Sequence, residues 1–216
     1  MPRKKIIEQQ DTGYSFYKRY LEKGMELLDT MSRKHRKVMQ TRMDFRYPQE
    51  MKTDGSNRDF SRTLQGLTKE LRREGYDPQY IARREQKDQP HQHYHLDIVT
   101  NAKNHESRQR IIEKAERHWG NALGMTQEDI HERQLVYPCT KDKDGNMRPN
   151  GYMLSRGTED FEATRGMMIR QMAYVTKYIS EDTTPSTTRK FFISQYGKLP
   201  KEVKNPFHDE AEGADS

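Results

Sequence analysis

The chain has 216 residues, of which 31% are hydrophobic and 33% are charged, and it carries a net charge of +6. This length suits one large domain or two small ones, and the low hydrophobic content predicts exposed helices and a disordered tail beside the core. The single Cys139 excludes an internal disulfide framework. No signal peptide is recognised and no apolar run reaches the ~18 residues of a membrane span, so we expect a cytoplasmic protein without a membrane partner.

The spacing of apolar residues predicts helices and strands along most of the chain. In chain order these are a helix at residues 14–39, a strand at 39–48, a helix at 56–73, strands at 80–86 and 91–100, a helix at 107–119, a strand at 134–138 and a helix at 161–179. Residues 1–13 are expected to be flexible, and residues 183–216 are expected to be a largely disordered extension. Residues 14–182 then form the folded domain.

Basic residues gather in two short runs, at residues 33–37 and at residues 72–73. The first run closes the first predicted helix, where cations are stabilised by the helix dipole. The same run also suits contact with phosphate groups, and the basic charge of the chain favours nucleic acid as a partner. Both interpretations of residues 33–37 stay open.

Residues 91–98, HQHYHLDI, alternate between polar and apolar side chains as a half-buried strand does. Side chains two residues apart share a face of a strand, so the histidines and the aspartate lie on one face and the apolar residues on the other. The first face holds His91, His93, His95 and Asp97, and the second holds Gln92, Tyr94, Leu96 and Ile98. The apolar face is expected in the core, and the histidine face needs another explanation.

A metal ion would explain the histidine face. If residues 80–86 and 91–99 pair as an antiparallel hairpin, the Glu85 carboxylate lies beside His93 and His95. Two imidazoles, one carboxylate and open coordination positions describe a catalytic metal site. His91 and Asp97 share the face and are candidate outer-shell groups. The alternative is that the histidines are half-exposed residues on a polar strand face.

Tyrosine and lysine recur on the last predicted helix, in QMAYVTKYIS at residues 171–180. Helical spacing makes Tyr174, Lys177 and Tyr178 neighbours on the helix surface, outside the apolar stripe. A tyrosine hydroxyl can attack a phosphorus atom whose oxygens a metal polarises, and a lysine adds positive charge for the phosphate. The alternative is ordinary, with tyrosines flanking a core stripe and a lysine facing water.

Taken together and in this order, HYH at 93–95 and YVTKY at 174–178 resemble the HUH superfamily of single-strand DNA endonucleases. The closer likeness is to the replication initiators of filamentous phages and related prophages. It covers roughly residues 14–182 and includes TRMDFRYP, HYHL, GYML and AYVTKY. The resemblance implies an α+β fold, RRM-like or ferredoxin-like, in which helices pack on an antiparallel sheet.

The resemblance also implies a role for each matching residue. Glu85, His93 and His95 match the ligands of Mg²⁺ or Mn²⁺, Tyr174 the nucleophile, Lys177 the motif lysine and Tyr178 the second tyrosine of some initiators. The implied activity is site-specific nicking and joining of single-stranded or origin DNA through a 5′-phosphotyrosine intermediate, which starts rolling-circle replication. Little sequence follows the tyrosines, so a host helicase and a host polymerase are expected partners. Thr176 departs from the alanine that relatives often have.

Other functions stay open. One is a DNA-binding regulator that keeps the fold without the chemistry, and another is a metal-dependent hydrolase that uses water in place of tyrosine. Mobilisation relaxases and some transposases carry the same types of residue, and these motifs do not separate them from replication initiators.

Overall fold

The computed structural model describes residues 6–9, 14–87, 90–104, 106–141, 144–178 and 182–195. Its strands are β1 (Ile6–Gln9), β2 (Tyr14–Tyr17), β3 (Lys37–Phe45), β4 (Gln79–Glu85), β5 (His93–Asn101), β6 (Val136–Tyr137), β7 (Met153–Ser155) and β8 (Phe191–Ile193). Its helices are α1 (Lys18–Lys34), α2 (Arg58–Arg73), α3 (Arg108–Leu123), α4 (Gln127–Glu132) and α5 (Phe161–Val175).

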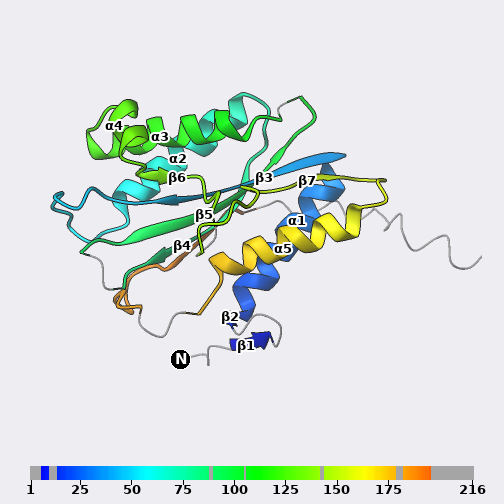
Figure 1. The fold of residues 1–216 in the computed structure, drawn as a ribbon, viewed down its shortest axis with the longest axis horizontal. Coiled ribbons are helices and arrows are strands. Elements are labelled where there is room, and N and C mark those ends of the chain that lie inside the picture. The colour runs from blue at the N-terminus through cyan, green and yellow to red at the C-terminus, as the bar shows by residue number, and fades with distance from the viewer. Residues whose placement is uncertain are drawn as a thin grey trace, which may run out of the picture.

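The fold is α+β, with an open antiparallel sheet of six strands between two layers of helices (Figure 1). The strand order is β6-β3-β5-β4-β8, and β7 pairs with β3 beside β6. The strands β1 and β2 form a separate two-stranded sheet. The prediction of an antiparallel sheet flanked by helices is therefore confirmed. In the part of the chain that the structure describes, no helix has both the length and the apolar composition needed to cross a membrane.

Side chains on the two faces of the sheet belong to two separate cores. Helices α2 and α3 cover one face, and α1 and α5 cover the other (Figure 1). The first core contains Met43 and Phe45 of β3, Leu96 and Ile98 of β5, and Leu67, Leu71 and Trp119 of the helices. The second contains Val38, Val99, Leu27, Leu28, Met168 and Met172. The alternation predicted for residues 91–98 is confirmed, because Tyr94, Leu96 and Ile98 of β5 face α2 and α3.

The second core covers only half of the sheet face on which it lies. Beyond Val38 and Val99, the same face of β3 and β5 carries polar residues, among them Asp44 and His95, which are direct partners across the strands. Helix α5 ends at Val175, close to this polar half. The sheet thus presents a polar region at the end of α5, and the candidate site lies there.

The start of the chain differs from the prediction of one helix over 14–39. Tyr14–Tyr17 is strand β2, α1 ends at Lys34, and β3 begins at Lys37. The helical spacing continued across these boundaries because Phe16, Val38 and Met39 are buried strand residues that happen to stay in phase with the helix. Local periodicity cannot tell such a continuation from a longer helix.

The structure contains further elements that the sequence pattern did not predict. They include α4 and the short strands β7 and β8, and β8 forms the edge of the main sheet beside β4. Strand β1 lies within residues 1–13 and β8 lies within residues 183–216, the two segments expected to lack structure. Residues 1–5, 10–13, 179–181 and 196–216 lie outside the described residues, so the expectations for them are not addressed.

The segment before β7 approaches β3 closely. The backbone N–H of Gln40 donates to Tyr152 O at 2.9 Å, and that of Arg42 donates to Asn150 O at 3.2 Å. Gly151, between these partners, has φ 133°, and a Cβ atom there would lie 2.1 Å from Gln40 O. Only glycine fits this approach, which covers the outer edge of β3 where it passes the candidate site.

Candidate functional site

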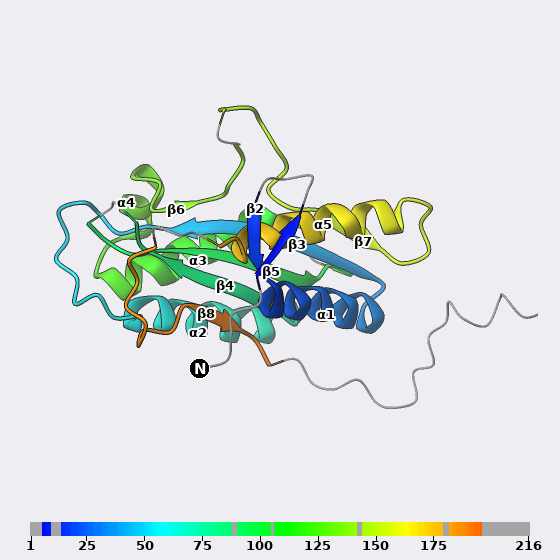
Figure 2. The same cartoon turned by 90° about the horizontal axis from the view of Figure 1, so that it is seen from below.

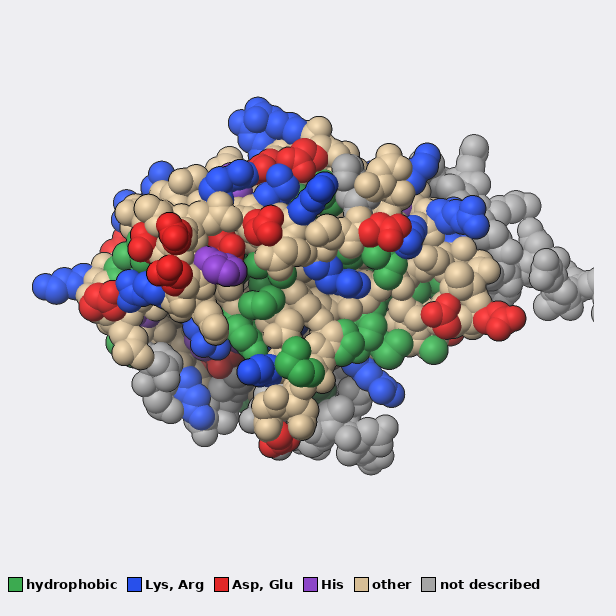
Figure 3. All heavy atoms as spheres, turned by 45° about the horizontal axis from the view of Figure 1, so that its top comes forward, with side chains coloured by type: hydrophobic (Ala, Val, Ile, Leu, Met, Phe, Trp, Pro, Cys, Tyr) green, Lys and Arg blue, Asp and Glu red, His purple; other side chains and the backbone are tan. Residues whose placement is uncertain are grey.

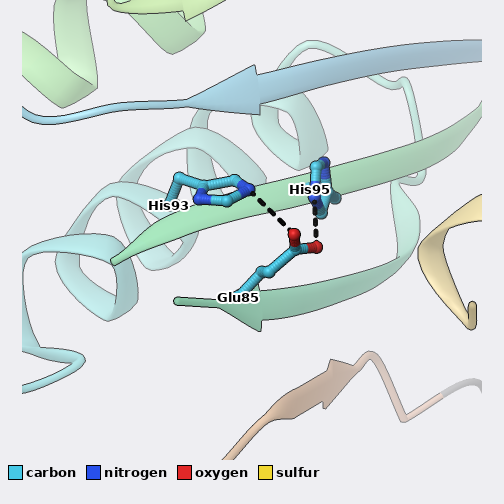
Figure 4. Close-up of side chains that lie close together, drawn as sticks. All are labelled: Glu85, His93 and His95. Carbon is cyan, nitrogen blue, oxygen red and sulfur yellow. Dashed lines mark hydrogen bonds and ion pairs between the residues drawn. The ribbon is translucent and has the colours of Figure 1, made fainter. Parts of the chain in front are cut away.

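Glu85, His93 and His95 come together at the ends of β4 and β5. Glu85 and His93 are direct partners across the hairpin, and His95 follows two residues later on the same face. His95 Nε2 lies 3.1 Å from Glu85 Oε2, and His93 Nε2 lies 3.7 Å from Glu85 Oε1. Figure 4 shows the carboxylate reaching from its strand toward both imidazoles. We call these three residues the metal-binding cluster.

The donor atoms of the cluster suit a single cation. One ligand atom from each residue lies within 4.8 Å of the others. Two ligands at about 2.1 Å from one ion lie at most about 4.2 Å apart, and both measured N···O distances fall below this limit. Two imidazoles and one carboxylate form a donor set that divalent transition metals and Mg²⁺ or Mn²⁺ accept.

The pKa values of His93 and Glu85 also suit the binding of a cation. Burial, followed by the charge of His95, lowers the pKa of His93 to about 4, so this imidazole is neutral near pH 7. Burial alone would raise the pKa of Glu85, but the hydrogen bond and charge of His95 and the charge of Arg83 lower it to about 2. His93 and Glu85 therefore already have the protonation state that a metal ligand needs. Although burial opposes it, Asp44 and Glu85 raise the pKa of His95, so this imidazole has to lose a proton when it binds a metal.

Asp44 of β3 orients His95 from the side opposite Glu85. Its Oδ1 accepts a hydrogen bond from His95 Nδ1 at 2.7 Å, and His95 is 5% exposed. Burial opposes the shift, but the charge of His95 holds the pKa of Asp44 well below its usual range. A carboxylate on one ring nitrogen directs the other nitrogen toward a metal, as outer-shell carboxylates do in metalloenzymes.

Tyr174, in the last turn of α5, lies next to the cluster. Its ring centre is 5.8 Å from that of His95, with the two rings nearly perpendicular. It is 41% exposed, although it belongs to a helix whose Met168, Met172 and Val175 are buried. The phenol therefore combines access to solvent with a fixed place beside the cluster.

Arg42 lies over the ring of Tyr174 and is buried there. Its guanidinium carbon is 4.0 Å from the centre of the Tyr174 ring, and its Nη2 is 3.9 Å from Asp44 Oδ1. The residue is only 1% exposed, yet its Nε and Nη2 have no hydrogen-bond partner among the described residues. Burying donors without hydrogen-bond partners costs stability, so these two donors of Arg42 beside a tyrosine indicate a functional constraint.

Lys177 and Tyr178 are not on α5, which corrects the predicted helix over 161–179. The helix ends at Val175, and Lys177 forms an antiparallel bridge with Phe16 of β2. The backbone N–H of Tyr178 donates to Ser15 O at 2.6 Å. The chain leaves the helix here because β2 supplies these backbone partners, and β2 was predicted as helix.

The two residues consequently differ in their relation to Tyr174. Lys177 Nζ is 6.0 Å from the centre of the Tyr174 ring, so the lysine stays close to the nucleophile predicted from the sequence. The ring of Tyr178 instead packs edge-to-face on Tyr17, with centres 5.5 Å apart. Tyr174 and Tyr178 therefore do not share one helical face.

The two candidate outer-shell groups, His91 before β5 and Asp97 within it, take other roles. His91 Nε2 lies 3.1 Å from Gln49 O. Asp97 is fully buried under α5, where it accepts a hydrogen bond from Gln40 at 2.8 Å, and burial raises its pKa to about 7. Asp44 holds the outer-shell position in their place.

Sequence reasoning missed three charged residues of the site: Arg42, Asp44 and Arg83. Arg83, one strand away from His95, donates hydrogen bonds to Glu85 and to the Lys177 carbonyl. Arg42 and Asp44 alternate with Met43 and Phe45, so the sequence places them on the polar face of β3. The pairing of β3 with β5, which brings that face to the histidines, is a tertiary contact that the pattern does not contain.

A family model described as the YagK/YfjJ C-terminal domain matches residues 3–192. The chain belongs to this family. The matched range includes every residue of the metal-binding cluster, Tyr174, strand β1 and the first two residues of β8. No curated protein and no solved structure matched the chain.

Proposed function

We propose that the protein is a metal-dependent endonuclease that nicks and rejoins single-stranded DNA through Tyr174. The observation that carries the proposal is the meeting of Glu85, His93 and His95 with an exposed tyrosine whose ring centre is 5.8 Å from that of His95. These are the residue types and the order of motifs in which the chain resembles HUH rolling-circle initiators. A role in initiating rolling-circle replication is part of this proposal.

The reaction is a transesterification at one phosphodiester. The Tyr174 oxygen forms a bond to phosphorus, the bond from phosphorus to the 3′ oxygen breaks, and the DNA strand is left with a 3′ hydroxyl and a 5′-phosphotyrosine. The phenol proton leaves to solvent, to which the tyrosine is exposed, and the departing 3′ oxygen takes up a proton. The reverse reaction rejoins the strand.

A bound Mg²⁺ or Mn²⁺ would polarise the phosphoryl oxygens and stabilise the charge that develops on them. Glu85, His93 and His95 are the residues that would hold it. Arg42 holds the Tyr174 ring in place, because its guanidinium lies 4.0 Å from the ring centre. Lys177, also near that ring, supplies a positive charge for the scissile phosphate.

The test is the formation of a covalent protein–DNA adduct. The protein is incubated with Mn²⁺ and labelled single-stranded DNA of randomised sequence, then denatured and separated on a gel. We expect a labelled protein band that EDTA abolishes and that His93→Ala and His95→Ala reduce more than about 100-fold, because each variant removes a metal ligand. His131→Ala is the matched control, since His131 is exposed on α4 and pairs with Glu116.

The same reaction mixtures, run on a second gel without denaturation to detect DNA binding, separate the rival functions. DNA binding without cleavage would favour a regulator that lacks the chemistry. Cleavage without a covalent adduct would favour a hydrolase that uses water. Either result contradicts the proposal.

A further inference from the structure

A basic pocket lies at the opposite end of β3 from the metal-binding cluster. It has a volume of about 670 Å³ and is formed where α1 runs into β3, with residues that follow β5 and β7. Five basic side chains line it: Lys34, Arg36, Lys37, Lys103 and Arg156. Among its described lining residues, Glu106 is the one carboxylate. We call these five residues the basic pocket.

This concentration of charge is local. Figure 3 shows acidic and basic side chains mixed over the face that it draws, so the net charge of +6 does not by itself mark a binding surface. In the basic pocket, by contrast, basic residues outnumber acidic ones five to one. A concave site with this excess attracts a polyanion more strongly than the mixed surface does.

Two of the five cations are available to a ligand. Lys34 pairs with Asp77 at 2.8 Å, Lys37 pairs with Glu106 at 2.5 Å, and Arg156 donates a hydrogen bond to Arg33 O at 3.2 Å. Arg36 and Lys103 are exposed, and neither has a hydrogen bond or ion pair from its side chain within the described ranges. They can therefore bind phosphate without breaking an existing ion pair.

The distance from the basic pocket to the metal-binding cluster can be estimated along β3 and along α5. Asp44, which touches His95, follows Lys37 by seven residues on β3, which is about 23 Å at ~3.3 Å per residue. Helix α5 begins three residues after Thr158 of the pocket wall and carries Tyr174 in its last turn, which is about 20 Å along the helix axis. The two estimates agree, so one ligand that follows α5 can reach both sites.

Helix α5 also carries a positively charged side chain between the two sites. Arg170 is exposed and lies one turn before Tyr174, so the two side chains share a face of the helix. A nucleic-acid strand with the duplex rise of ~3.4 Å per nucleotide covers 23 Å in about seven nucleotides, and this number is an upper limit for a more extended single strand. The spacing therefore fits a DNA strand that passes from Tyr174 over Arg170 to the basic pocket.

We propose that the basic pocket is a second DNA-backbone site, which holds the substrate strand about seven nucleotides from the scissile phosphate. The proposal rests on the proposed function, since it takes the strand at Tyr174 to be the same DNA. Its role is affinity and placement of the strand, with no part in the chemical step.

The test compares two double variants with the same change in charge. Arg36→Gln with Lys103→Gln removes the available cations of the pocket. Arg62→Gln with Lys69→Gln is the control, because these residues are exposed on α2, which covers the other face of the sheet. Both are made in a Tyr174→Phe background, so that no adduct forms, and their affinity for fluorescent oligo(dT) of 4 to 20 nucleotides is measured by anisotropy.

For the longest oligonucleotide we expect the pocket variant to bind about tenfold more weakly at low salt than the control. The slope of log affinity against log salt should fall by about 1.4, since each lost phosphate contact contributes about 0.7 for single strands. Affinity should rise steeply once the oligonucleotide is long enough to span both sites, and this rise should be lost in the pocket variant alone.

Equal affinities and equal length dependence in the two double variants would overturn the proposal. A protein with intact Tyr174 that shows the pocket effect but forms no adduct with Mn²⁺ would overturn the proposed function and leave the DNA site standing. Absence of DNA binding in all variants would overturn both.

Discussion

Asp44 shows how a single residue outside the cluster controls it. Its carboxylate accepts the Nδ1 hydrogen bond of His95, and this contact directs Nε2 toward Glu85. We predict that Asp44→Asn weakens Mn²⁺ binding by about 10- to 100-fold, because the amide keeps the volume but loses the charge that fixes the imidazole. Titration calorimetry without DNA measures this, with Asp54→Asn in an exposed loop as the control. Unchanged affinity would show that Asp44 has no part in the site.

We expect that replacing Arg42 changes the rate of adduct formation more than it changes the stability of the fold. Arg42→Met removes two buried donors that lack hydrogen-bond partners, but it also removes the cation paired with Asp44, so the two effects oppose each other and the unfolding temperature should change little. The rate of adduct formation should fall at least about tenfold, since the ring of Tyr174 loses the cation above it.

Arg42→Lys keeps the charge and should restore part of that rate. The comparison needs thermal unfolding and adduct formation on the same preparations. A large fall in unfolding temperature with an unchanged rate would mean that Arg42 is only a structural residue.

At the scale of elements, Glu70 connects α2 to α3. It accepts hydrogen bonds from Lys114 at 2.7 Å and His118 at 2.8 Å, and it pairs with Arg117. Although burial would raise the pKa of Glu70, its hydrogen bonds to Arg117, Lys114 and His118 lower it to about 2. A carboxylate with a lowered pKa stabilises the fold above its unfolded value of about 4.3, and this contribution is lost as pH falls toward 2.

Glu70→Gln should therefore be less stable than the wild type near pH 7, and the two should converge between pH 4 and pH 2. The urea midpoint measured across this range is the readout. Glu128→Gln, an exposed residue of α4 with no ion pair in the part of the chain that the structure describes, should show no such dependence. A difference for Glu70→Gln that persists unchanged at pH 2 would contradict this assignment.

The elements differ in how well the sequence predicts them, for physical reasons. Strand β5 and helix α2 follow from local periodicity, because one face of each is apolar and buried. Strand β6 lies within the strand predicted at residues 134–138. Strands β7 and β8 are three residues long and depend on pairing with β3 or β4, which no local pattern records. Helix α4 did have a local signal, the capping box of Thr126 and Asp129.

The residues of the candidate site also differ in how well the sequence predicts their positions. Glu85, His93 and His95 could be placed together because a hairpin joins residues close in sequence. Asp44, Arg42 and Tyr174 reach them only through the β3–β5 pairing and the packing of α5 on the sheet.

At the scale of the whole molecule, the sheet has a core on each face, and the second core stops short of the ends of β4 and β5. Half of that sheet face is therefore polar. The end of α5 places Tyr174 there, beside the metal-binding cluster. The other end of α5 begins at the wall of the basic pocket. One helix thus relates the proposed chemical step to the proposed second contact with DNA.

The identity of the residue that becomes joined to DNA is the most direct test of this account. After reaction with Mn²⁺ and single-stranded DNA, the protein is digested with nuclease and trypsin and its peptides are mapped by mass spectrometry. Trypsin cuts after Arg170 and Lys177, so Tyr174 and Tyr178 fall in different peptides. We predict a nucleotide on the peptide of residues 171–177, no adduct in Tyr174→Phe, and continued nicking by Tyr178→Phe. A nucleotide found only on the peptide that begins at Tyr178, or cleavage that leaves no nucleotide on the protein, would contradict the account.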